Sequence, residues 1–166
     1  MLLSSTVIAL ASTMLVLADG CAAPPASTTT AEATVTGQQQ SFTRLFSQST
    51  SGYPEPAEEV IRDRRALEAV WRALHSGNQG AELPAVDFAR STLVLIAVGE
   101  RSTGGHAIRV DRVTRKGDAA IVHYTVTRPG PGCMTTQVMT APAELISIPR
   151  IGGEVRFQPT SVVEPC

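Results

Sequence analysis

The segment STLVLIAVG, residues 91–99, is the most apolar run of the chain outside its first twenty residues. A strand with one face in water alternates apolar and polar side chains, whereas a strand that is buried on both faces is apolar without interruption. The segment therefore predicts a central strand of a sheet, and the rest of the chain has to cover both of its faces.

One segment has the period of an amphipathic helix rather than that of a strand. Its sequence, DRRALEAVWRALHSGN, begins at Asp63, which is placed to cap the helix, and contains Gly77, which is placed to end it. The apolar stripe falls at i, i+3 or i+4, and i+7: Leu67, Val70 or Trp71, and Leu74. Because Trp71 lies on this stripe, we expect it in the core rather than on a ligand-binding surface.

Most of the remaining periodic segments favour strands. Six of them are residues 41–48, 58–63, 106–115, 118–129, 144–150 and 153–159. The sequence KGD, between the third and the fourth, is typical of a hairpin turn. No long helix is available to cross between parallel strands. The sequence thus predicts an α+β fold that is mainly β, with an antiparallel sheet of about six or seven strands and one amphipathic helix packed on it.

The first forty residues differ in composition from the rest of the chain. Residues 1–20 begin with MLLSSTVIALASTMLVLA, which we interpret as an export signal, although no Lys or Arg precedes the apolar run. Residues 21–40 have almost no large apolar side chains to bury, so they predict a disordered tether. A single folded domain is expected over residues 41–166.

Cys21 ends the sequence LADGC, which is similar to a bacterial lipobox, where a small residue precedes a lipid-carrying cysteine. The match is imperfect, since Asp19 stands where a small neutral residue is expected. We expect Cys21 to carry lipid, and the alternative is cleavage to a plain secreted protein. In both cases the domain is extracytoplasmic, in the bacterial cell envelope or secreted from it.

Two cysteines remain once Cys21 is lipidated or removed with the signal, namely Cys133 in GPGCMTT and Cys166. An even number of cysteines in an exported chain predicts a disulfide between them. Closing a loop of about thirty-four residues adds about 3–4 kcal/mol to stability in the chain-entropy model. No His or third Cys lies at ligand spacing around either residue, so we expect no metal site.

Three classes of chemistry find no support in the sequence. The Gly-rich segment after the apolar run lacks the glycine spacing and the Lys-Ser/Thr pair of a phosphate-binding loop. The net charge is −1 and the basic residues are scattered, so no electrostatic footprint for nucleic acid is present. His75, His106 and His123 fall on separate predicted elements, and the chain has no G-x-S-x-G motif. We therefore expect neither a catalytic residue nor a cofactor.

Two segments rich in Gly and Pro are long for simple connections: GERSTGGH, residues 99–106, and RPGPGCMTTQVMTAP, residues 128–142. The strands predicted between them form a hairpin, which brings both segments to the same end of the sheet. Paired glycines leave backbone N–H and C=O groups accessible to a partner chain. The residues expected to contact a protein partner are Arg101, Ser102, Thr103, Gly104, Gly105, His106, Gly132, Met134 and Gln137.

In this order, the segments resemble the C-terminal domain of the protease complex subunit PrcB family. The similarity runs from Glu58 to Pro149 and includes LEAVWRAL, VDF, the apolar run, STGGHAIRV, TRPGPGCMTTQVMTAP and ISIPR. Relatives typically have Pro before the Thr-Gly-Gly and an aromatic residue after it, where this chain has Ser102 and His106. The resemblance implies an exported, often lipidated protein that associates with a secreted protease and has no catalytic group of its own.

Three hypotheses for the two Gly/Pro-rich segments stay open at this point. In the first, the domain binds a protein partner, such as a secreted protease, and catalyses nothing. In the second, it is a protease inhibitor, because a Thr-Gly hairpin loop beside a Pro-rich loop is similar to the loop wedge of cysteine protease inhibitors. In the third, both segments are structural, with Gly for positive φ, Pro for rigid turns and Cys133 for the disulfide.

Mass spectrometry of the mature N-terminus tests the lipoprotein hypothesis. We expect the mature chain to begin at Cys21 and to carry the added mass of acyl chains, because an apolar segment and LADGC precede it. A Cys21→Ser variant should lose that mass and leave the membrane fraction. A wild-type chain with a free amine downstream of Cys21 would refute lipidation.

Overall fold

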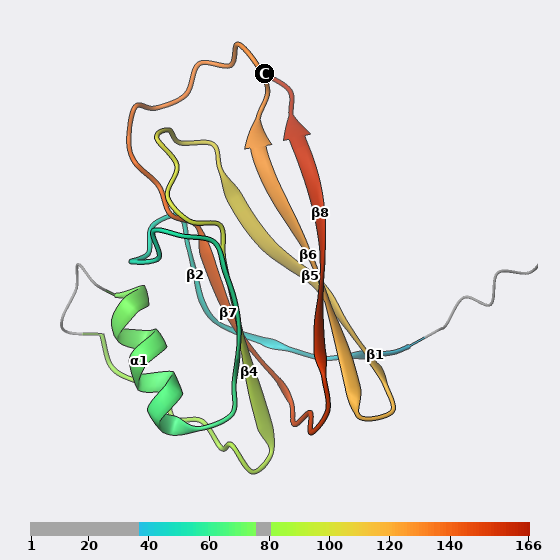
Figure 1. Ribbon diagram of the computed structural model, residues 1–166. Coiled ribbons are helices and arrows are strands. Elements are labelled where there is room, and N and C mark those ends of the chain that lie inside the picture. The colour runs from blue at the N-terminus through green and yellow to red at the C-terminus, as the bar shows by residue number, and fades with distance from the viewer. Residues whose placement is uncertain (1–36, 76–80) are drawn as a thin grey trace, which may run out of the picture. The chain divides into compact units, whose positions relative to one another are not determined.

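The apolar run forms β4 (Ser91–Ala97), an interior strand of a four-stranded sheet with the order β2-β7-β4-β3 (Figure 1). The structure is a computed structural model that describes residues 37–75 and 81–166. The signal-like segment, Cys21, most of the predicted tether and Gly77 lie outside the described residues. The other strands are β2 (Thr43–Gln48), β3 (Ala57–Ile61) and β7 (Ala143–Pro149), and all three strand pairs of this sheet are antiparallel.

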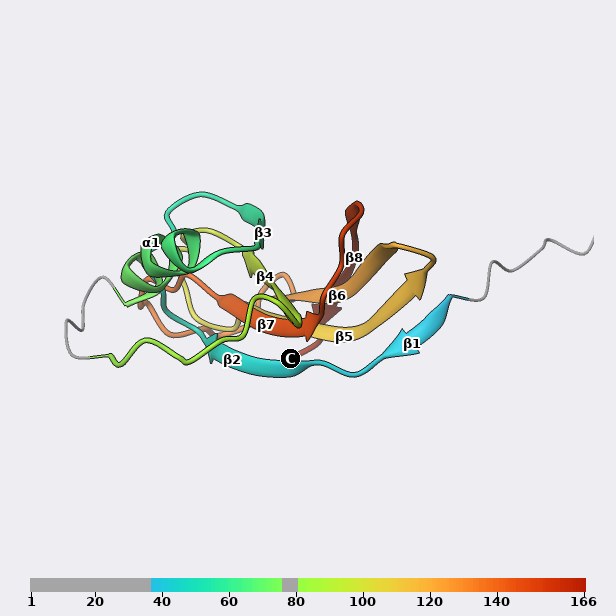
Figure 2. The ribbon, with the colours of Figure 1, turned by 90° about the horizontal axis from the view of Figure 1, so that it is seen from below.

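A second four-stranded sheet, with the order β1-β5-β6-β8, packs on one face of the first (Figure 2). Its strands are β1 (Gln38–Gln40), β5 (Ala107–Lys116), β6 (Ala119–Pro129) and β8 (Val155–Glu164). β5 and β6 form the hairpin that KGD predicts, with Gly117 at φ +61° in its turn. The described residues thus confirm a mainly β fold.

The helix α1 (Arg64–Leu74) covers the other face of the first sheet. Asp63 caps it as predicted, because its side chain accepts a hydrogen bond from the Ala66 amide at 2.9 Å. The stripe residues Leu67, Val70 and Leu74 are buried, and Trp71 is half-buried against the same core. No helix within residues 37–75 and 81–166 is long and apolar enough to cross a membrane.

Alternate side chains of β4 enter two different hydrophobic cores. Leu93 and Leu95 face α1, whereas Val94 and Ile96 face the second sheet, and none of the four is more than 1% exposed. The order of layers is therefore helix, sheet, sheet. This arrangement explains why the run is apolar at every position, because each face of β4 has its own covering layer.

The predicted single sheet of six or seven strands is wrong, since the described residues form eight strands in two sheets of four. β6 and β8 are also parallel, although no helix connects them. The connection between them is β7, which lies in the other sheet. In addition, Gln38–Gln40 pairs with β5, so the ordered domain begins before the predicted boundary at residue 41.

An ion pair of the first sheet, with a completely buried carboxylate, forms hydrogen bonds to the backbone of the second sheet. Glu144 on β7 is 0% exposed, and its Oε1 accepts a bond from Arg44 Nε on β2 at 2.5 Å. The other oxygen, Oε2, accepts from the Val110 amide on β5 at 2.9 Å, and Arg44 Nη2 donates to the Val110 carbonyl at 2.7 Å. Both backbone groups of Val110 are therefore bonded to side chains of the opposite sheet.

The register irregularities of two strands occur next to this ion pair. The pairing of β5 with β6 shifts between Val110 and Arg112, and that of β2 with β7 shifts between Arg44 and Phe46. At a β-bulge, the backbone N–H and C=O groups of the extra residue are not paired with the neighbouring strand. The carboxylate of Glu144 and the guanidinium of Arg44 satisfy the backbone groups of Val110 at the β5 bulge.

Replacing Glu144 with Gln tests the contribution of this ion pair to stability. We expect the free energy of unfolding in urea to fall by about 1.5–3 kcal/mol, because a buried charge-assisted network loses its charge. Glu68→Gln is the matched control, since Glu68 forms an exposed pair with Arg64 on α1. The control should lose less than about 0.5 kcal/mol. Equal losses in the two variants would contradict this role of Glu144.

Candidate functional site

The two Gly/Pro-rich segments lie side by side, as the sequence predicts. We name residues 99–106 the Thr-Gly-Gly loop and residues 130–142 the Pro-Gly loop. The Arg101 amide donates to the Thr140 carbonyl at 2.7 Å, and the Thr140 amide donates back at 2.9 Å. The Gly104 amide donates to the Thr136 carbonyl at 2.9 Å, and Thr140 Oγ1 donates to the Thr103 carbonyl at 2.9 Å. Four hydrogen bonds thus hold the loops together.

The paired glycines have separate structural causes. Gly104 is buried, and a Cβ there would collide with the hydroxyl oxygen of Thr136. Gly105 has φ +82°, which side chains rarely tolerate, and a Cβ there would lie against the ring of Pro129. Gly132, in the Pro-Gly loop, also has φ +82° but faces open space. Part of the hypothesis that these loops are structural is therefore correct.

The side chain of Arg101 is engaged inside its own loop. Its guanidinium donates to the carbonyls of Val98 and Glu100, each at 2.8 Å. The sequence places Arg101 among the residues that contact a partner, but two of its donors hold the start of the Thr-Gly-Gly loop in place. Replacing Arg101 would therefore alter the loop as well as any contact that it makes.

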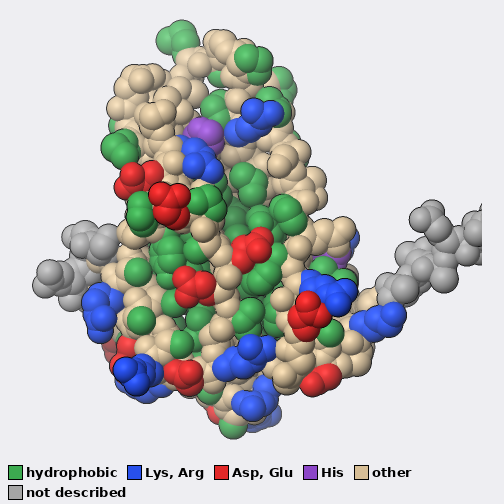
Figure 3. Space-filling model, viewed as in Figure 1, with side chains coloured by type: hydrophobic (Ala, Val, Ile, Leu, Met, Phe, Trp, Pro, Cys, Tyr) green, Lys and Arg blue, Asp and Glu red, His purple; other side chains and the backbone are tan. Residues whose placement is uncertain are grey.

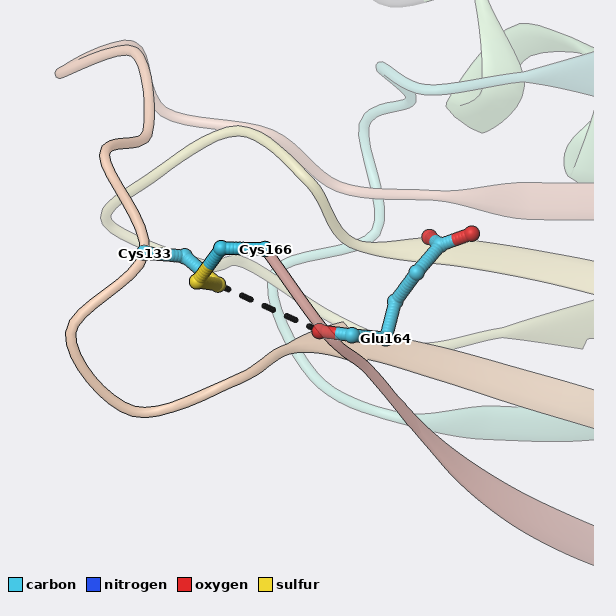
Figure 4. The surroundings of a disulfide bond; sticks show 3 residues. All are labelled: Cys133, Glu164 and Cys166. Carbon is cyan, nitrogen blue, oxygen red and sulfur yellow. Dashed lines mark hydrogen bonds between the residues drawn. A yellow bond between two sulfur atoms is a disulfide. The ribbon is translucent and has the colours of Figure 1, made fainter.

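A disulfide ties the Pro-Gly loop to the end of β8. Cys133 and Cys166 are joined as expected, with their Cα atoms 5.4 Å apart (Figure 4). The Gly130 amide donates to the Glu164 carbonyl at 2.9 Å, next to the disulfide. The Pro-Gly loop is thus held on one side by the Thr-Gly-Gly loop and on the other side by β8.

Exposed apolar side chains gather at this end of the domain. Met134 is fully exposed at 101%, and Val138 and Met139 in the same loop are 59% and 61% exposed. Val162 and Val163 add 41% and 43% at the end of β8. These five are the exposed large hydrophobic residues of the described chain, and Figure 3 shows hydrophobic side chains at that end. We name the two loops and the end of β8 the loop face.

The structure divides the predicted contact residues into three groups by their exposure. Ser102, Gly105, Gly132, Met134 and Gln137 are exposed on the loop face, and Arg101, Thr103 and His106 are half-buried, while Gly104 is buried between the loops. Sequence reasoning missed Val138, Met139, Val162 and Val163. A signal was available in the first pair, because QVMTAP places two apolar residues in a loop that has no periodicity.

The histidines do not come together. His106 lies on the loop face, where burial and then the nearby charge of Arg101 lower its pKa. His123 lies on β6, where burial and then Arg112 lower its pKa. His75 lies at the end of α1, with its ring 4.3 Å from that of Trp71. Within the described ranges, no group of three or more His, Cys, Asp or Glu side chains is placed to hold a metal ion.

One family model matches part of the chain. Residues 92–149 match the family model described as PrcB C-terminal, about a third of the chain, from β4 through the loop face to β7. No curated protein and no solved structure matches the chain. The match begins at Thr92, so α1 and β3 lie outside it, although the sequence resemblance extends to Glu58. The resemblance to the PrcB C-terminal domain is thus confirmed over residues 92–149.

Proposed function

We propose that this chain is a non-catalytic, exported accessory subunit, lipid-anchored through Cys21, that binds an extracytoplasmic protease through its loop face. The family match supports a protein partner within a protease complex. The observation that carries the choice of surface is the position of the exposed apolar side chains. All five belong to the Pro-Gly loop or to the end of β8.

Exposed methionine and valine side chains favour a protein partner over a small charged ligand. Apolar side chains gathered in one exposed patch usually mark an interaction site, because they gain free energy when a partner removes them from water. Methionine adapts its shape to an irregular partner surface. Ser102 and Gln137 are also exposed on the loop face, and their polar groups suit the rim of a protein interface.

The loop face is held in place before a partner binds. Four interloop hydrogen bonds and the disulfide between Cys133 and Cys166 restrain the Pro-Gly loop from two sides. A restrained loop loses less conformational entropy on binding than a free one, so more of its contact energy contributes to affinity.

One observation favours a second function, inhibition of a protease. The fully exposed Met134 directly follows the disulfide-bonded Cys133, so the loop presents its most exposed apolar side chain next to the disulfide. A wedge inhibitor inserts such a loop into an active-site cleft. The two functions use the same face but have opposite effects on proteolysis, so one assay distinguishes them.

Replacing Met134 with Ser tests the loop face. The full chain, immobilised, should capture protease from solubilised envelopes of the source cells, and Met134→Ser should reduce capture by about tenfold if this side chain is a central contact. Exposed substitutions of this kind change stability by less than about 0.5 kcal/mol, so the melting temperature should barely change. The matched control is Lys116→Ser, at the hairpin tip between β5 and β6.

Two results would contradict the proposal. Capture that is unchanged in Met134→Ser but lost in Lys116→Ser would place the binding surface at the opposite end of the β5–β6 hairpin. Equal loss in both variants would show that capture does not depend on the loop face. Proteolysis measured with and without the purified chain then separates an accessory subunit, which preserves or raises activity, from an inhibitor, which abolishes it.

The environment of His106 gives a further test of how the loops are packed. The lowered pKa of His106 means that the folded state favours the neutral ring. This contribution to stability is complete above pH 6.5, the ordinary pKa of histidine, and is lost as the pH falls below that value. NMR titration should give a pKa for the His106 ring below 6.5, and Arg101→Gln should raise it, since one neighbouring charge is removed. His123 is the internal control, because its nearby guanidinium is that of Arg112. A His106 pKa unaffected by the substitution would contradict this packing.

A further inference from the structure

A cavity of about 830 Å³ lies between β2 and the end of α1. Residues 44–48 of β2 line one side in unbroken succession, and Trp71, Leu74 and His75 of α1 line the other. Successive side chains of a strand point to opposite faces of its sheet. A cavity that contacts five successive residues therefore lies along the edge of the strand rather than over one face.

The edge of β2 along this cavity has no partner strand. β2 is the outermost strand of its sheet, and within the described residues it pairs with β7 alone. A strand with one free edge presents a row of backbone N–H and C=O groups that another extended chain can pair with. The cavity thus combines open backbone groups with space to accommodate a chain.

The opposite wall of the cavity is an aromatic shelf. The rings of Trp71 and His75 lie 4.3 Å apart, and the ring of Phe46 lies 5.1 Å from that of His75. The Trp71 Nε1 donates to the Ala81 carbonyl at 3.3 Å, which fixes the orientation of the indole. The Gly52 amide donates to the Ala73 carbonyl at 3.1 Å, so the chain that follows β2 is joined to α1. The shelf is suited to an apolar side chain of an incoming segment.

The charge of the lining limits the composition of the occupant. Arg44 is the one residue with a full charge among the described residues that line the cavity, and its side chain is 44% exposed. No carboxylate is present among these lining residues to attract a cation. An extended segment without Lys or Arg therefore fits this groove better than a basic one.

The groove adjoins the loop face. The Ser49 carbonyl, just beyond β2, accepts a bond from the Ala141 amide at 2.9 Å. Ser51, which lines the cavity, donates its hydroxyl to the Ala141 carbonyl at 2.8 Å. Because Ala141 belongs to the Pro-Gly loop, one protein partner could contact both surfaces.

We propose that an extended peptide segment of a partner protein, apolar at alternate positions and free of Lys and Arg, adds to β2 as a new edge strand. About five residues would pair along β2, with one apolar side chain against Trp71 and His75. The inference rests on the proposed function only in that the occupant belongs to a protein. It does not require the loop face to be the main contact.

A peptide selection on the purified full chain tests this proposal without knowledge of the partner. The probe is a displayed library of random ten-residue peptides, and we expect enrichment of sequences with apolar residues at alternate positions and no Lys or Arg. A selected peptide is then resynthesised with single N-methyl groups along its backbone. Strand addition predicts a period of two, because alternate N–H groups donate to β2, and each loss should weaken binding by about fivefold.

Two matched variants locate the site. Gln48 on β2 and Gln158 on β8 are both exposed on edge strands. Gln48→Trp, at the end of β2, should obstruct the groove and weaken peptide binding at least about tenfold, whereas Gln158→Trp should leave it within about twofold. Met134→Ser should also leave peptide binding unchanged, which separates this result from the test of the loop face.

Three outcomes would overturn the proposal. The first is a selection that enriches no peptide over a control without protein. The second is an N-methyl scan without a period of two, because the peptide would then not pair as a strand. The third is peptide binding that Gln158→Trp abolishes and Gln48→Trp preserves, because the open edge of β8 would then be the site.

Discussion

The carboxylate of Glu144 is the constraint on which the relation between the two sheets depends. It is completely buried in a layer that is otherwise almost entirely apolar, so its charge has to be compensated by the partners within reach. Those partners, Arg44 and the amide of Val110, belong to β2 and β5. Apolar packing alone would allow one sheet to slide over the other, whereas this network has few alternative positions. The network lies where the pairing of β2 and of β5 is irregular. It therefore fixes both how the two sheets contact each other and how these strands twist locally.

The loop face depends on the position of one sheet relative to the other. The Thr-Gly-Gly loop connects β4 to β5, and the Pro-Gly loop connects β6 to β7, so each loop links one sheet to the other. Two such loops can form hydrogen bonds with each other only when the sheets are correctly placed. The bonds between Arg101 and Thr140 are therefore a distant consequence of the packing around Glu144. The face that we assign to a partner is built by the core rather than by the loops alone.

Local patterns in the sequence predicted most elements, and long-range pairing decided the rest. The helix, its cap at Asp63 and the hairpin at Gly117 follow from periodicity and turn chemistry, which act over a few residues. The division into two sheets could not be predicted, because alternation in a strand does not say which sheet it joins. The parallel pairing of β6 with β8 and the strand formed by Gln38–Gln40 depend on partners far away in sequence. At the candidate site, the pattern brought the two loops together correctly, but it could not show that Arg101 binds its own loop.

The parallel arrangement of β6 and β8 also determines how the domain transmits mechanical load. Both strands end at the loop face, and the disulfide joins the Pro-Gly loop, which continues from β6, to the end of β8 (Figure 1). A pull on the Pro-Gly loop enters β6 through the backbone and β8 through the sulfur atoms. The two strands then carry tension side by side, and the load passes to the long antiparallel ladder between β6 and β5 as shear. Many hydrogen bonds in such a ladder resist shear together, so a pull on the Pro-Gly loop is distributed along the length of the hairpin.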